Sequence, residues 1–297
     1  MNYANCHPDA PWAHHVRELS DFWASISGVN GDELPILANI RVQSHENLFE
    51  DFMHDSPLGV ALDLLGSVLF ELAIENVFGV PPGDITGWKN KIDWQLERAH
   101  LEFTNWCGST GKEQSQPTFK HLTLSMHTLT DWPVLKAKAH NSTVVLEWFA
   151  TATCHHISDE RSEFRNYCVQ NFAGTWHLVQ ATKFPNWRLS DSQARQFELL
   201  RQRSLMAYEW LSKDSAAKSL YRYKVRPKLH HLDHGLRRSV RSKVSPSVTY
   251  SFSPEDFMGL CARMSSRCHG STIMRRGVAR WLVSFVVGLD ASDIDVY

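Results

Sequence analysis

Apolar residues recur at four-residue steps through the segment 45–79, and this is the strongest structural signal in the chain. The recurring positions are Val60, Leu64, Val68 and Leu72. That spacing predicts an α-helix of about 20 residues whose apolar stripe is wide enough for a helix of the core. The polar residues Asp51 and His54 precede this helix, and the run 47–50 before them is predicted to be a short strand.

Helical periodicity also dominates the rest of the chain. The predicted helices cover roughly 85–106, 135–149, 164–179, 193–212, 255–268 and 274–289. Ser190 is the predicted N-cap of the fourth of these helices. Strand patterns are few, and they gather near 36–51 and 247–252. The sequence therefore predicts a mainly α protein in which a large helical, bundle-like block accompanies one small residual β-sheet.

The net charge of −1 hides a strong polarity along the chain. Residues 218–280 hold 14 basic and three acidic side chains, whereas residues 1–217 hold 17 basic and 26 acidic ones. A block this basic is an electrostatic footprint for phosphate, and nucleic acid is the first candidate. The alternative is a basic face that pairs with the acidic part of the same chain.

Between Arg222 and Lys228, basic residues alternate with apolar or aromatic ones, a pattern that suits an extended segment lying along a phosphate backbone. The predicted DNA contacts are Arg222, Lys224, Arg226, Lys228, His230, Arg237, Arg238, Arg241 and Lys243. His230 and His234 stand four residues apart, so they are expected to share one face of a helix. A purely structural role for His230 is the alternative.

Composition excludes some classes of protein. With 43% hydrophobic and 21% charged residues, the chain is typical of ordinary globular proteins. It has no uninterrupted apolar run of about 18 residues, so a membrane span is not expected, and its first residues do not have the pattern of a secretory signal. The six cysteines include no C-x-x-C pair, which favours reduced thiols in an intracellular, soluble protein.

Two short motifs remain. The first consists of Asp51, Phe52, Met53 and His54 followed by Leu58, Gly59 and Val60. The second runs from Arg226, Pro227, Lys228, Leu229 and His230 to Glu255, Asp256, Phe257, Met258 and Gly259. Together they resemble RNase H-like cut-and-paste transposases of the CACTA and KDZ kind, over roughly residues 40–290.

This resemblance implies a division of the chain into parts. Residues 1–80 and 245–297 would form the residual RNase H-like core, and 85–220 would be a helical insertion domain. Residues 221–244 would be the basic connecting segment between them.

The resemblance also implies chemistry with Mg²⁺ or Mn²⁺, because such enzymes use a pair of metal ions held by carboxylates. Asp51 and Glu255 would be the catalytic metal ligands, and His54 would orient the phosphate or a carboxylate. Asp51 is alternatively a helix cap or a supporting residue, and Glu255 a residue that stabilises a helix start. The first aspartate of the family pattern has no suitable counterpart upstream of Asp51, so we expect the chain to be catalytically incomplete.

The sequence therefore predicts a nuclear, transposase-derived DNA-binding protein with no membrane partner, acting alone or as a homo-oligomer. The alternative function is a non-enzymatic helical module that binds nucleic acid or an acidic protein.

Overall fold

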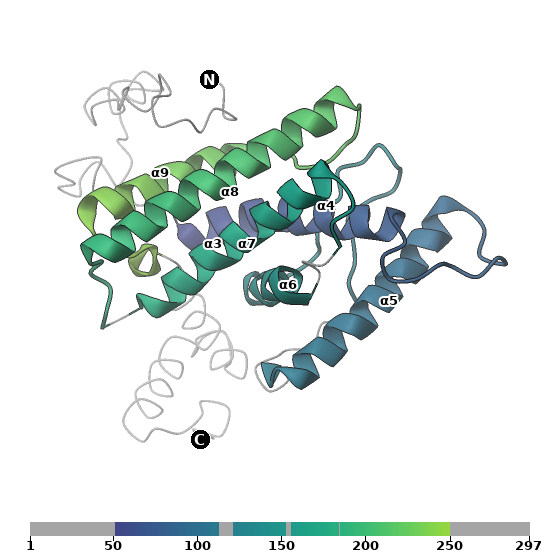
Figure 1. The fold of residues 1–297 in the computed structure, drawn as a ribbon, viewed down its shortest axis with the longest axis horizontal. Coiled ribbons are helices and arrows are strands. Elements are labelled where there is room, and N and C mark those ends of the chain that lie inside the picture. The colour runs from purple at the N-terminus through teal and green to yellow at the C-terminus, as the bar shows by residue number, and fades with distance from the viewer. Residues whose placement is uncertain (1–50, 113–120, 153–155, 184, 250–297) are drawn as a thin grey trace, which may run out of the picture. The chain divides into compact units, whose positions relative to one another are not determined.

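The computed structural model describes residues 51–112, 121–152, 156–183 and 185–249. The chain divides into two compact units, 1–249 and 250–297, and all described residues belong to the first. Its elements are α3 (Phe52–Asp55), the π-helical turn η3 (Ser56–Val60), α4 (Ala61–Ile74), α5 (Trp88–Ser109), α6 (Ala139–Ala152), α7 (Glu160–Ala181), α8 (Asp191–Ala217), α9 (Pro227–Ser242) and the 3₁₀ turn η5 (Pro246–Val248) (Figure 1).

The prediction of a mainly α protein is confirmed. The described residues contain no strand, only the isolated bridges Leu124–Leu135 and Arg188–Val244. The strand predicted from residue 247 is wrong at its start, because Ser245 caps the 3₁₀ turn Pro246–Val248 there and Pro246 has no N–H to donate. The remaining predicted strand positions lie outside the described residues, as do the helices predicted near 255–268 and 274–289.

The predicted core helix is present, but it starts earlier than expected: the continuous run is Phe52–Ile74, made of α3, η3 and α4, so His54 lies within it and not before it. Helices α5, α6 and α7 pack against α4, and α9 packs against α3, η3 and α8. By length and composition this run could cross a membrane, but 83% of its most apolar window is buried inside the fold. Burial on nearly all sides explains why it is apolar well beyond one stripe.

The other helices begin where local chemistry allows. Ser190 caps α8 as predicted, and its hydroxyl and the Gln193 side chain form a reciprocal capping box. Helix α6 starts only at Ala139 because the backbone of Leu135 is engaged elsewhere: its N–H donates to Leu62 O at 3.1 Å. Gly66 permits this approach, since a Cβ there would lie 2.5 Å from Pro133 O.

These contacts also change the predicted division of the chain. The segment after residue 51, the helical block and the basic segment form one compact unit, and the boundary between units follows Thr249. Residues 227–242 are not a connecting segment but the packed helix α9, which lies beside α8 (Figure 1). The predicted boundary near residue 80 does not separate compact units.

Candidate functional site

Asp51 and His54 lie together at the start of α3. The Asp51 carboxylate accepts a hydrogen bond from Met53 N at 2.9 Å and lies 2.6 Å from His54 Nδ1. Asp51 is therefore a helix cap, as the alternative interpretation had it. Glu255, its predicted partner in binding metal, lies outside the described residues. Within the described ranges, no three His, Cys, Asp or Glu side chains are grouped closely enough to hold a metal ion.

The two motifs are brought into contact although about 170 residues separate them. Lys228 Nζ donates to His54 O at 2.9 Å and to Leu58 O at 3.3 Å. Gly59 makes room for this lysine, because a Cβ at Gly59 would lie 2.8 Å from Lys228 Cδ. A lysine that caps two backbone carbonyls here holds α9 against the π-helical turn, so its first role is structural.

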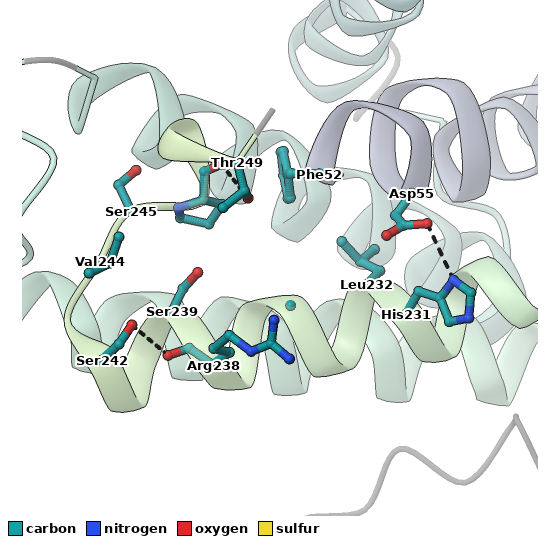
Figure 2. Close-up of a pocket in the computed structure, with 12 residues that line it drawn as sticks. Phe52, Asp55, His231, Leu232, Arg238, Ser239, Ser242, Val244, Ser245 and Thr249 are labelled. Carbon is teal, nitrogen blue, oxygen red and sulfur yellow. Dashed lines mark hydrogen bonds and ion pairs between the residues drawn. The ribbon is translucent and has the colours of Figure 1, made fainter. Parts of the chain in front are cut away.

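Next to His54, Asp55 on α3 faces His231 on α9 with 3.7 Å between Oδ1 and Nδ1 (Figure 2). The two side chains border a small cavity of about 20 Å³ that continues along α9 past Arg238 and Ser242 to Thr249. That volume holds about one water molecule and excludes a nucleotide base. This junction is therefore a packed interface between helices, with polar groups at its rim.

The extended part of the basic segment lies along α4. Three polar residues on one face of that helix, Asp63, Ser67 and Glu71, are buried and receive it. Tyr223 N donates to Ser67 Oγ at 2.9 Å, and Tyr223 OH donates to Glu71 Oε2 at 2.8 Å. The Arg226 guanidinium donates to Asp63 Oδ1 at 2.8 Å. Burial raises the pKa of Asp63 to about 6, although Arg226 and Lys224 oppose this rise.

Arg222 belongs to the core rather than to a surface. Arg222 is 5% exposed, and its guanidinium stacks over the Phe70 ring at 4.0 Å. Burial lowers its pKa to about 10, so it stays charged at neutral pH. The prediction that Arg222 contacts DNA has no accessible surface to support it, and we remove it from the interface. The neighbouring Lys224 lies over the Trp132 ring at 5.8 Å.

Glu71 is the hub that joins this segment to α7. It accepts hydrogen bonds from Arg161 Nη2 at 2.5 Å and from Arg165 Nη1 at 3.4 Å, besides that from Tyr223. Arg165 also forms a bidentate pair with Glu75, at 2.7 and 3.0 Å. Sequence reasoning missed this network, because it interpreted α4 only by its apolar positions. The sequence did contain a signal for this network: Asp63, Ser67 and Glu71 are polar residues spaced four apart in a helix that is otherwise apolar.

A second buried network fixes the middle of α9. Asp233 is fully buried, and it accepts hydrogen bonds from Arg201 of α8 and from Arg237 Nε at 3.2 Å. The Arg237 side chain is only 13% exposed, so it too is poorly placed to contact a phosphate. His230 and His234 share a face, as predicted, with ring centroids 4.3 Å apart. Burial and the neighbouring His230 lower the pKa of His234 to about 4.

The basic side chains that face solvent gather around the C-terminal half of α9. Arg241 is exposed, Arg238 is half-buried, and Lys243 pairs with the exposed Asp191 at 2.6 Å. Arg188, which is also exposed, joins them because its backbone bridges to Val244 and its guanidinium lies over the Trp187 ring at 4.7 Å. Nothing in the sequence pattern pointed to Arg188, since about 50 residues separate it from the rest. Compared with protein-family models, curated proteins and solved structures, the chain matches none of them.

Proposed function

We propose that this chain is a transposase-derived DNA-binding protein whose interface is the solvent-facing basic cluster Arg188, Arg238, Arg241 and Lys243. The observation that carries the proposal is the concentration of four cationic side chains around one helix end, with Asp191 as the acid paired to one of them. Phosphate contacts need cations that reach solvent, whereas Arg222 is buried and Arg237 is held by Asp233, so both serve the fold. Helix α9 itself carries no Phe, Tyr or Trp, which favours sequence-independent contact with the DNA backbone.

The transposase ancestry is part of the proposal, and the contact between the two resembling motifs supports it. Lys228 of the basic-P-K-x-H element donates a hydrogen bond to His54 O of the D-x-x-H element. The two elements therefore belong to one structural region, as they would in a common ancestor of this kind. We infer that the chain acts in the nucleus as a DNA-binding protein without strand transfer, because Asp51, the predicted metal ligand among the described residues, serves as a helix cap. If any activity persists, Asp51 and Glu255 would hold Mg²⁺ or Mn²⁺.

Fluorescence anisotropy of a labelled duplex, titrated at several salt concentrations, tests the binding. If four phosphates are engaged, log Kd should change with log salt by a slope of about 3.6, which weakens binding roughly 150-fold between 50 and 200 mM salt. The double variant Arg238→Gln/Arg241→Gln should flatten this slope by about 1.8. The matched control Lys89→Gln/Lys91→Gln removes the same charge from the exposed part of α5 and should leave the slope unchanged.

Two results would refute DNA binding by this cluster: wild-type protein with no salt-sensitive affinity for duplex or single-stranded DNA, or a double variant with the wild-type slope. An acidic protein would then be the better partner for this cluster. Incubation of supercoiled plasmid with Mg²⁺ or Mn²⁺ tests the loss of chemistry separately. Nicking that disappears in Glu255→Gln would show that the chain is still an enzyme.

A further inference from the structure

The outer face of the α7–α8 pair carries an apolar stripe that the fold does not cover. Tyr167 on α7 is 40% exposed, and Met206 and Leu199 on α8 are 55% and 44% exposed. Beside them, Phe164 and Trp210 are half-buried and stack with centroids 4.2 Å apart. Aromatic residues and methionine are enriched where proteins associate, and large apolar side chains grouped on one face mark such surfaces.

Contacts between the two helices fix which residues lie at the same level. Arg161 pairs with Asp214, Phe164 stacks on Trp210, and Cys168 lies 3.6 Å from Ser204 O. The helices are therefore antiparallel and lie side by side (Figure 1). This register places Tyr167 level with Met206, at the centre of the stripe.

The charges that flank the stripe differ in sign between the two helices. The exposed strip of α7 carries the acids Glu160 and Glu163. The exposed strip of α8 carries the bases Arg195, Arg203 and Lys213, of which Lys213 pairs with Glu209 on its own helix. A partner that matches this face must present a basic helix over α7 and an acidic helix over α8.

We propose that the partner is a second copy of this chain, bound face to face about a two-fold axis parallel to α7 and α8. That rotation lays α7 of one copy over α8 of the other, so Tyr167 meets Met206 of the second copy and Glu163 approaches its Lys213. The four helices then form an antiparallel bundle, in which each helix has neighbours of opposite direction. The arrangement covers the apolar stripe and brings the acidic start of α7 beside Lys213 of the second copy.

The size of the face is sufficient for a dimer. Helix α7 has 22 residues, which at 1.5 Å per residue is roughly 33 Å. Two helices about 10 Å apart make the face roughly 20 Å wide, so its area as a flat rectangle is on the order of 660 Å². A stable interface buries about 800 Å² on each partner. The accessible surface of side chains that project from the helices exceeds the area of the flat rectangle, and this excess supplies the remaining area.

Sedimentation velocity of the full chain between about 1 and 100 µM tests the proposal. The wild type should be a dimer at the higher concentrations, and Met206→Glu should weaken dimerisation at least tenfold, because it places a charge at the centre of the interface. Leu101→Glu is the control, since Leu101 on α5 is 48% exposed and lies on another helix. Circular dichroism should show equal helix content in all variants.

A charge exchange separates this geometry from other dimers. Glu163→Lys and Lys213→Glu should each weaken dimerisation, and the variant that carries both should recover it, because the pair is restored with reversed sign. The proposal is overturned if the wild type stays monomeric at 100 µM, if Met206→Glu dimerises like the wild type, or if the exchange gives no recovery. The wild type could also be monomeric while Met206→Glu speeds hydrogen exchange along α7 and α8. That result would mean that another part of the same chain covers this face, and it would overturn the proposal of a dimer.

Discussion

Replacement of Glu71 by Gln tests whether the basic segment is held by the fold or is available to a ligand. The substitution keeps the volume of the side chain but removes the charge that two arginines share. Arg161 Nη2 and Arg165 Nη1 lie 2.5 and 3.4 Å from the carboxylate, and Tyr223 OH lies 2.8 Å from it. Removing one member of a buried ion pair typically costs about 3–5 kcal/mol. Since both arginines keep a second carboxylate, we expect about 3 kcal/mol.

Urea denaturation followed by circular dichroism at 222 nm measures this loss. With an m-value of about 3 kcal/mol per M, the midpoint should fall by about 1 M at constant m. Tyr223→Phe is the matched control, because it removes one hydrogen bond to the same carboxylate and should cost about 1 kcal/mol. The double variant should cost less than the sum of the two single variants, since both act through one network.

A loss below about 1 kcal/mol in Glu71→Gln would refute the reasoning. It would mean that water or another group satisfies the two arginines in the variant as well as the Glu71 carboxylate does in the wild type. The segment around Tyr223 would then be loosely attached to α4, and its cations would again be candidates for phosphate contacts.

Two further predictions concern α4. Gly66→Ala should destabilise the fold by about 1–3 kcal/mol in the same urea assay, because its Cβ would lie 2.5 Å from Pro133 O and the backbone must shift. Gly83→Ala, where nothing lies within 4 Å, should change stability by less than about 0.5 kcal/mol. Burial raises the pKa of Asp63 from 3.8 to about 6, so the folded state binds the proton more tightly and this group's contribution to stability falls by about 2 kcal/mol as pH rises from 4 to 6. Asp63→Asn should lack that loss, so its stability relative to wild type should rise over this range; a constant difference from pH 4 to 6 would contradict the shift.

Much of the secondary structure could be predicted from local pattern. The four-residue spacing from Val60 to Leu72 indicated a core helix, and Ser190 followed by Gln193 indicated where α8 starts. Such signals are local, because a helix satisfies its own backbone and its caps lie within one turn. The helical start predicted at Leu135 was wrong, since a contact with Leu62 O, more than 70 residues away, holds that backbone extended.

Which basic residues are buried and which are exposed depends on the tertiary structure. The sequence established how many cations the chain carries between Arg222 and Lys243, but it treated them as one surface. The fold divides them: Arg222 is buried against Phe70, Arg237 is held by the buried Asp233, Lys228 caps carbonyls of the segment 54–58, and Arg241 remains exposed. A charge is accepted inside a protein only where partners from distant segments converge on it, and that convergence is a property of packing. The sequence by itself therefore determined most of the helices before residue 220 and the charge, and only the tertiary structure decided that residues 227–242 form a packed helix and which charges are left to meet a partner.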